Sequence, residues 1–307
     1  MSAHRSSRGA ALITALLVVA AATTLASTLI WRLDLWMRQV ETHRDLVQAR
    51  LLAIAGIDWA RAILADDART SAYDHASEPW GSKVPEMPAE GGEISGGLSD
   101  EQSKWNINNL LSNGKISQSE LEVFQRLLRL LQLPPELSLT VADWLDGPKE
   151  ESPGGAEDAY YLGLKPPYRS ANRELGDVDN LLRIRGFDIG IVERLRPYVC
   201  ALPGYNRVNI NTASAIVIAA ELPSLSLSEA PQIIANRDRV PLRDMTDFRN
   251  RLQNSKLVSD SDAARLDTRS RFFRASIHAR FGHADMTYAA LLDRLNAWPD
   301  IVWQKAE

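Results

Sequence analysis

The N-terminus reads MSAHRSSRG over residues 1–9 and AALITALLVVAAATTLASTLI over residues 10–30. The first segment is short and basic, whereas the second contains no charged side chain. An α-helix over residues 10–30, at ~1.5 Å per residue, is roughly 30 Å long, which matches the hydrocarbon core of a bilayer. Trp31 and Arg32 then place an aromatic ring and a charge at the interface. The sequence therefore predicts one membrane-spanning helix, over residues 10–31, with a cytoplasmic N-terminus.

The boundary between these two segments has the form of a processing site. A secretory signal usually has a shorter apolar region, of about 7 to 15 residues, with its cleavage site behind that region. Here the glycine stands in front of the apolar run, and Arg8-Gly9 followed by AALI resembles the leader of type IV pilins and pseudopilins. A prepilin peptidase cuts such leaders after the glycine and methylates the new N-terminus. The resemblance implies cleavage between Gly9 and Ala10 and methylation of Ala10; an uncut signal anchor is the alternative.

The helical pattern continues beyond the apolar run. Leu52, Ala55, Trp59 and Ile63 recur at spacings of three and four and form one apolar stripe. No proline interrupts residues 10–72. We therefore expect a continuous helix whose first half lies in lipid and whose second half packs on a globular head, as in pilins. The stripe is the expected partner interface, although part of it must pack on the protein's own sheet.

Thr14 occupies a position that is informative in the pilin-like proteins. These subunits usually have a glutamate at the fifth residue after the cut, which would be position 14 here. In the resembled proteins this carboxylate offsets the N-terminal ammonium of a neighbouring subunit in apolar surroundings, where an unpaired charge costs several kcal/mol. The resemblance implies that a subunit with Thr14 occupies the filament tip. The alternative is that Thr14 is simply a tolerated polar residue in a membrane helix.

The remaining chain changes from loops to helices and then to strands. Residues 77–99 are rich in Pro, Gly and Glu, which favours loops or short edge strands. Ser117 and Glu120 form a capping-box pattern at the start of the helical patterns. From residue 273, apolar and polar side chains alternate on both sides of a Gly282 turn, which predicts a β-hairpin, with a possible last strand at 301–303.

These patterns predict an α+β fold of the type IV pilin kind, in which a long N-terminal helix packs on a small antiparallel sheet and a large all-α domain is inserted. The predicted parts are a leader at 1–9, the membrane helix at 10–31, an α+β body formed by 32–110 with 268–307, and the inserted helical domain at 111–267.

Four strings in the predicted helical domain resemble one family. They are DWLD at 143–146, GAEDAYYL at 155–162, PYRSANR at 167–173 and VNINTAS at 208–214. Together with the leader, the missing glutamate and the helical insertion, they resemble the K-type minor pseudopilins of the type II secretion system, also called the general secretion pathway protein K family. The matching segments cover most of the chain in order.

This resemblance implies a function and a location. The protein would join the I-type and J-type minor pseudopilins and the other pseudopilins of the filament, cap the tip of the periplasmic pseudopilus and help to start its assembly. The filament serves the export of folded proteins across the outer membrane. The chain would be anchored once in the inner membrane, with its head in the periplasm, and would be a substrate of the prepilin peptidase.

The loop between two of these strings suits a hard cation. Asp143, Asp146, Glu157 and Asp158 converge from the two ends of a Gly/Pro-rich loop, and Ca²⁺ takes six to eight oxygen ligands in flexible geometry. In the resembled family this region binds calcium, but a further acid two positions after Asp146 is replaced here by Pro148. The alternative is an acidic, solvated loop whose carboxylates cap helices.

The alternative hypothesis is a DNA-binding protein of an uptake system. VNINTA at 208–213 also resembles the start of helix-hairpin-helix modules, which bind phosphates through a glycine-containing hairpin. Residues 222–226, LPSLS, stand at the hairpin without a glycine, and acids interleave the arginines at 237, 239, 243, 249 and 251. We therefore expect no nucleic-acid binding, and we expect Asn211 to cap its helix.

The composition excludes several other classes. Against 35 basic side chains stand 39 acidic ones, a net charge of −4, which excludes a bulk basic surface. The single cysteine, Cys200, cannot form an intramolecular disulfide. The HExxH, GxSxG and GxxxxGK[ST] motifs are absent, and pairs such as Glu157 with Asp158, or His278 with Asp285, name no reaction by themselves. We therefore expect a protein without catalytic activity.

Overall fold

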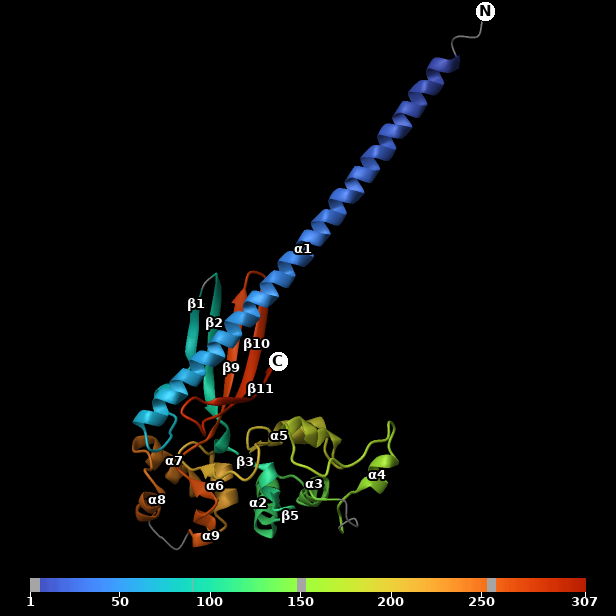
Figure 1. Cartoon of the computed structure of the whole chain (residues 1–307). Coiled ribbons are helices and arrows are strands. Elements are labelled where there is room, and N and C mark those ends of the chain that lie inside the picture. The colour runs from blue at the N-terminus through green and yellow to red at the C-terminus, as the bar shows by residue number, and fades with distance from the viewer. Residues whose placement is uncertain (1–5, 90, 148–152, 253–257) are drawn as a thin grey trace, which may run out of the picture.

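The computed structural model describes residues 6–89, 91–147, 153–252 and 258–307. Its most prominent element is α1 (Ser6–Thr70), which projects from a globular head (Figure 1). Every residue from Gly9 to Arg44 is exposed, and α1 contains a stretch long and apolar enough to cross a membrane. The long N-terminal helix predicted from the sequence is confirmed.

The head contains a five-stranded antiparallel sheet with the order β1-β2-β9-β10-β11. The strands are β1 (Val84–Ala89), β2 (Gly92–Asp100), β9 (Phe272–Phe281), β10 (Ala284–Asp293) and β11 (Asp300–Ala306). β9 and β10 form the expected hairpin around Gly282, whose φ of 55° suits glycine. Within the segment expected to form loops or edge strands, β2 is an interior strand, because β9 pairs with it along its whole length.

The second half of α1 packs across one face of this sheet (Figure 1). Its sheet-facing residues are small or aliphatic: Ala53, Ile57, Ala60 and Leu64 are buried against β9 and β10. Gly56 allows the close approach, since a Cβ there would lie 2.7 Å from Ile94 Cδ1. Alanine and glycine on this side of the helix therefore set the distance between α1 and the sheet.

Between β2 and β9 the chain forms a helical region, defined here as residues 105–267, which lies at the end of the sheet away from the exposed part of α1 (Figure 1). Its α-helices are α2 (Gln118–Leu130), α3 (Leu137–Leu145), α4 (Asp158–Leu162), α5 (Ile189–Leu195), α6 (Ala215–Glu221), α7 (Ala230–Arg239), α8 (Met245–Arg251) and α9 (Asp260–Ala263). Short 3-10 helices η1 (Pro79–Gly81), η2 (Glu101–Ser103), η3 (Ile107–Leu110) and η4 (Val178–Arg183) complete the helical elements.

Three short strand pairs connect these elements. β3 (Trp105–Asn106) pairs in parallel with β6 (Val199–Cys200), β4 (Leu111–Ser112) with β5 (Lys115–Ile116) as a hairpin, and β7 (Val208–Asn209) in parallel with β8 (Leu266–Asp267). Two separate hydrophobic clusters fill the helical region, one around Phe124 and Trp144 and one around Val217 and Phe248. The predicted domain boundaries at 111 and 267 stay a prediction.

Ser117 is the N-cap of α2, and its hydroxyl accepts a hydrogen bond from the amide of Glu120 at 3.5 Å. The expected reciprocal half of the capping box is wrong. The Glu120 side chain is buried and accepts hydrogen bonds from Trp105 Nε1 at 3.1 Å and from Tyr205 Oη at 3.3 Å. Two aromatic donors therefore replace the backbone amide that a capping box would use.

Candidate functional site

The predicted cleavage site lies in the first turns of α1. Gly9 and Ala10 are exposed, and a Cβ placed on Gly9 would meet nothing within 4 Å. Thr14 is also exposed, and its hydroxyl donates to the carbonyl of Ala11 at 3.0 Å. The helix backbone therefore satisfies the only polar group at position 14, and residues 10–30 contribute no carboxylate.

The predicted apolar stripe is divided by its contact with the sheet. Leu52 and Ile63 are partly buried, whereas Ala55 and Trp59 are exposed, and the tryptophan is 46% exposed. Trp59 and Ile63 line a shallow groove beside β1 and β2, with Val84 among the other lining residues. About half of the predicted interface is therefore available to another molecule.

Further exposed apolar residues extend this surface toward the N-terminus of α1. Val47 and Leu51 precede Ala55 and Trp59 at spacings of four, and all four side chains are exposed. We call these four residues the α1 ridge. Residues four apart on an α-helix lie on one face, so the ridge is a continuous apolar strip along the helix. The sequence pattern located its lower half and missed Val47 and Leu51.

The predicted calcium loop brings carboxylates together from both of its ends. Asp143 is buried on α3, Asp146 is the C-cap of that helix, and Glu157 is the buried N-cap of α4. A Cβ on Gly155 would lie 1.9 Å from Asp143 Oδ2, so the second half of the loop packs on Asp143. Burial and the charges of Asp143 and Asp146 raise the pKa of Glu157.

The fourth predicted ligand, Asp158, is held by the protein itself. Its Oδ1 accepts from the amide and the hydroxyl of Ser170, both at 3.0 Å, and Arg169 lies 3.8 Å from Oδ2. Asn172 adds an oxygen that the sequence did not predict. Its backbone amide donates to the carbonyl of Trp144 at 3.0 Å, and its buried side-chain Oδ1 has no hydrogen-bond partner among the described residues. Carboxylate and amide oxygens are both ligand types that calcium takes. Pro148 lies outside the described residues.

Asp67, Asp74 and Glu78 form a different carboxylate group, in which one oxygen of each lies within 4.8 Å of the others. The guanidinium of Arg294 already fills part of this group. Its Nη1 lies 2.6 Å from Asp67 Oδ2, and its Nη2 lies 2.6 Å from both carboxylate oxygens of Asp74. We therefore assign this group to packing between α1 and the sheet.

The VNINTAS string forms structural contacts. The expectation that Asn211 caps α6 is wrong. Ser214 is the N-cap, and its hydroxyl accepts a hydrogen bond from the amide of Val217 at 3.4 Å. Asn211 instead exchanges two hydrogen bonds with the backbone of Leu242, at 2.8 and 2.9 Å. Because the side-chain amide can donate and accept at once, it replaces a β-ladder contact between two loops.

Four of the five arginines considered for nucleic-acid binding have partners within the helical region, which does not support the DNA-binding hypothesis. Arg237 is buried and Arg251 is half-buried. The partners are the carbonyl of Ile210 for Arg237, Asp260 for Arg249 at 2.6 Å, and Asp247 for both Arg251 and Arg243. The acids Asp247 and Asp260 offset the charges of Arg243, Arg249 and Arg251, which weakens the basic face that phosphate binding requires.

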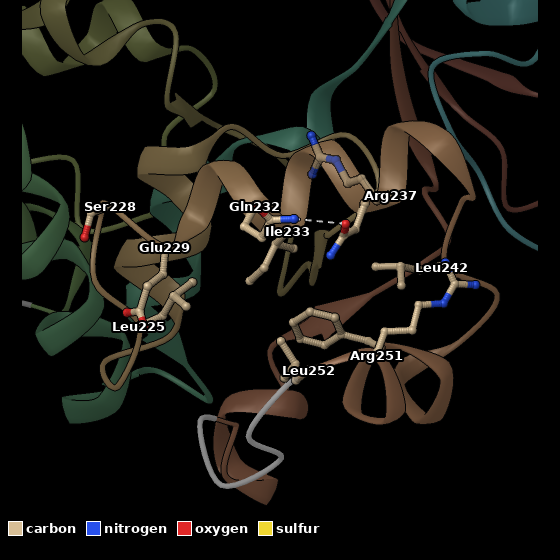
Figure 2. A pocket seen from close by; sticks show the side chains of 11 residues that line it. Leu225, Ser228, Glu229, Gln232, Ile233, Arg237, Leu242, Arg251 and Leu252 are labelled. Carbon is tan, nitrogen blue, oxygen red and sulfur yellow. Dashed lines mark hydrogen bonds between the residues drawn. The ribbon is translucent and has the colours of Figure 1, made fainter.

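A pocket of about 300 Å³ lies between α7 and α8 (Figure 2). Leu225, Ile233, Leu242, Phe248 and Leu252 contribute its apolar lining. At its rim Gln232 Nε2 donates to Asn236 Oδ1 at 3.2 Å. None of the described lining residues is a histidine or a cysteine. The pair of His278 and Asp285, 3.4 Å apart, lies elsewhere, with His278 half-buried on β9 and Asp285 exposed on β10. Neither place by itself names a reaction.

Comparison with known proteins identifies the same family across the chain. Two family models, both described as type II secretion system (T2SS), protein K, match residues 103–204 and 208–269. A protein of Pseudomonas aeruginosa named type II secretion system protein K is 32% identical over 303 residues, covering 95% of this chain and 90% of that protein. A protein of the same name from Pectobacterium carotovorum is 30% identical, covering 93% and 92%.

One solved structure has the same fold. It is titled the crystal structure of the GspK-GspI-GspJ complex from the enterotoxigenic Escherichia coli type 2 secretion system. The similarity has a TM-score of 0.78 at 20% identity and covers 88% of this chain and 99% of the other. The predicted α+β fold with a long N-terminal helix and a small antiparallel sheet is confirmed.

Proposed function

The chain belongs to the type II secretion system protein K family, and we propose that it is a minor pseudopilin that caps the periplasmic pseudopilus and helps to start its assembly. The observation that carries the capping role is the absence of any carboxylate between residues 10 and 30. A subunit stacked above would bring its own N-terminal ammonium into lipid, where an unpaired charge is strongly unfavourable. This chain offers no partner for that charge.

The position of the helical region supports the same conclusion. It lies at the end of the head away from the membrane part of α1 (Figure 1). In a filament whose subunits align their N-terminal helices, this bulk would stand where the head of a subunit above has to pack. The head lies in the periplasm, with α1 as a single-pass anchor in the inner membrane. The protein acts through contacts and is itself no enzyme.

The proposed partners are the I-type and J-type minor pseudopilins, with other pseudopilins below them and the prepilin peptidase as the processing enzyme. The similar solved structure is a complex of a GspK with a GspI and a GspJ. The α1 ridge offers a surface for such partners, because it is apolar, exposed and continuous with the membrane part of the helix. Buried aromatic anchors contribute most to binding energy at such surfaces, which makes Trp59 the residue to test.

The test is co-purification of the full-length chain, in detergent, with the I-type and J-type pseudopilins of its own organism. We expect a stable three-way complex, and we expect Trp59→Ala to weaken it by about 2 kcal/mol or more, roughly 30-fold in dissociation constant. Trp298→Ala is the matched control, because Trp298 is also 46% exposed but stacks on Arg61 instead of lying on the ridge.

Failure of the three proteins to associate at high concentration would contradict the proposed function. Equal affinity of the wild-type chain and the Trp59→Ala chain, with the complex intact, would leave the capping role and overturn the assignment of the α1 ridge.

Calcium is proposed as a structural cofactor of the loop between α3 and α4. Asp143, Asp146, Glu157 and the Asn172 side-chain carbonyl would hold it, and the ion would offset the mutual repulsion of the buried carboxylates. Asp158 would contribute through its contacts with Ser170.

Millimolar Ca²⁺ is expected to raise the melting temperature of the full-length chain, and EGTA is expected to reverse the change. At 100-fold excess over the dissociation constant the gain is roughly 2.7 kcal/mol, which corresponds to roughly 5–10 °C. Glu157→Gln should remove most of this shift, while Glu122→Gln, an exposed carboxylate on α2, should keep it. Identical melting curves with Ca²⁺ and with EGTA would exclude the site.

A further inference from the structure

One buried carboxylate joins the sheet to the helical region. Asp100 ends β2 and is 5% exposed. Its Oδ2 accepts hydrogen bonds from Thr212 Oγ1 at 2.5 Å, Ser270 Oγ at 2.7 Å and Asn209 Nδ2 at 3.1 Å, and its Oδ1 accepts from the amide of Gln102 at 2.8 Å. Thr212 and Asn209 belong to the helical region, whereas Ser270 precedes β9. We call this set the Asp100 joint.

All of the donors to Asp100 are neutral groups. The charge of Asp74 opposes ionisation of Asp100, and Arg294 pairs with Asp74. Glu101 pairs with Lys104 at 3.0 Å. Within the part of the chain that the structure describes, none of the groups that donate a hydrogen bond to Asp100 is a cation. A buried carboxylate without a counter-charge is costly in its ionised form.

The remaining titratable neighbour is Cys200, which is buried on β6. Burial raises the pKa of this thiol well above its usual range, and the charges of Glu101 and Asp100 add to the effect. The thiol is therefore neutral over the pH range in which carboxyl groups titrate. It adds no charge that could stabilise an ionised Asp100.

The joint can form a complete hydrogen-bond set with or without a proton on Asp100. In the ionised form both hydroxyls donate to the carboxylate. Thr212 Oγ1 also lies 3.3 Å from the carbonyl of Asn209. When Asp100 is protonated, its O–H can donate to Thr212 Oγ1 while the Thr212 hydroxyl turns to that carbonyl. Hydroxyls serve as donor and acceptor, so no group in either set is left without a partner.

We propose that Asp100 is a proton-controlled latch between the sheet and the helical region, which holds them together more firmly when its carboxyl group is protonated. The latch belongs to this chain alone and does not depend on which proteins bind it. In the closed joint the proton is retained, and in an opened joint, where water reaches the carboxylate, it is released at moderate pH.

The direction of the pH dependence follows from burial. Burial and the charge of Asp74 raise the pKa of Asp100 from 3.8 to about 6, against the opposing effect of the hydroxyl donors. Because the folded value lies above the unfolded one, ionisation disfavours the closed state. Stability of the joint is therefore gained as the pH falls through 6, and the gain is complete near 3.8. Opening should be about tenfold rarer at pH 5 than at pH 8.

Hydrogen exchange of the full-length chain in detergent tests the latch. The reporters are the amides of Gln102 and Asn211, which donate to Asp100 Oδ1 at 2.8 Å and to Asn209 Oδ1 at 2.9 Å. After correction for the intrinsic exchange rate, we expect their protection to be about tenfold higher at pH 5 than at pH 8. Amides in the centre of β9 should change less.

Asp100→Asn, whose amide can donate to either hydroxyl, should make protection at the reporters nearly independent of pH. Asp66→Asn, an exposed carboxylate near the end of α1, is the matched control and should keep the tenfold change. If Asp100→Asn does not fold, a carboxyl-carbon titration of the wild-type chain decides: a midpoint near 6 for Asp100 supports the latch. A midpoint near 3.8, or full pH dependence in Asp100→Asn, would overturn it.

Discussion

Gly9→Leu is expected to abolish removal of the leader and, as a result, protein secretion. The proposed cut separates Gly9 from Ala10, and a branched side chain would occupy the space that the peptidase leaves for glycine. An uncut chain keeps Arg5 and Arg8 on its N-terminus. Lifting the subunit into a filament would draw these charges into the bilayer, at a cost of about 2.5–3.5 kcal/mol each. Mass spectrometry of the membrane-extracted protein should show residues 1–9 retained.

The substitution at Gly9 is informative because it should leave the fold unchanged. A Cβ at this position meets nothing within 4 Å, and leucine has a higher helix propensity than glycine. Gly9→Ala is the graded control, since one methyl group is the smallest possible addition. The wild-type protein should begin at Ala10. A wild-type protein that still begins at Met1 in cells with an active prepilin peptidase would contradict the cleavage assignment.

The features that the sequence predicted correctly depend on long, local patterns. The uncharged run at 10–30 and the lack of proline up to residue 72 determine α1 almost alone, because helix formation needs only local hydrogen bonds. The alternation from residue 273 similarly predicts the hairpin of β9 and β10. The family assignment came from the four strings instead, because short loop segments have no periodicity from which a structure can be predicted.

The incorrect expectations share another cause, which is that distant residues decide the local structure. β2 contains three glycines and few residues of high strand propensity, yet pairing with β1 and β9 makes it an interior strand. The spacing rule that found Leu52 and Ile63 did not identify Ala53 and Ala60, which are buried against the sheet beside them. Asn211 and Glu120 find partners in Leu242 and Trp105, which no spacing rule connects to them.

The candidate calcium loop illustrates the same limit within one site. The sequence placed Asp143, Asp146 and Glu157 at the two ends of a loop. In the structure the charges of Asp143 and Asp146 raise the pKa of Glu157. The sequence could not identify Asn172, because that residue reaches the loop through a backbone hydrogen bond to Trp144. It also could not foresee that Ser170 holds Asp158. Side-chain oxygens meet through tertiary contacts, and those depend on the packed fold.

The second large effect is expected from Arg265→Ala, which should cost about 3–5 kcal/mol of folding free energy. Arg265 bonds to Glu221 Oε2 at 2.9 Å, to the Glu221 carbonyl at 2.7 Å and to Asp262 Oδ1 at 2.7 Å, and Glu221 is 1% exposed. Burial raises the pKa of Glu221, and the nearby charge of Glu120 adds to this, while Arg265 opposes both. Without the guanidinium, Glu221 and Asp262 lose their buried counter-charge.

Chemical unfolding of the full-length chain, followed by tryptophan fluorescence, measures this loss. Domains are stable by about 5–15 kcal/mol, so much of the stability of the region around α6 should disappear. Arg243→Ala is the control, because the Arg243 side chain is 74% exposed and a surface pair contributes about 0–1 kcal/mol. Adding Glu221→Gln to Arg265→Ala should restore part of the stability, since it removes the uncompensated carboxylate. If Arg265→Ala costs no more than the control, the buried cluster does not support the junction between α6 and α9, and packing of Val217 and Leu266 alone must hold it.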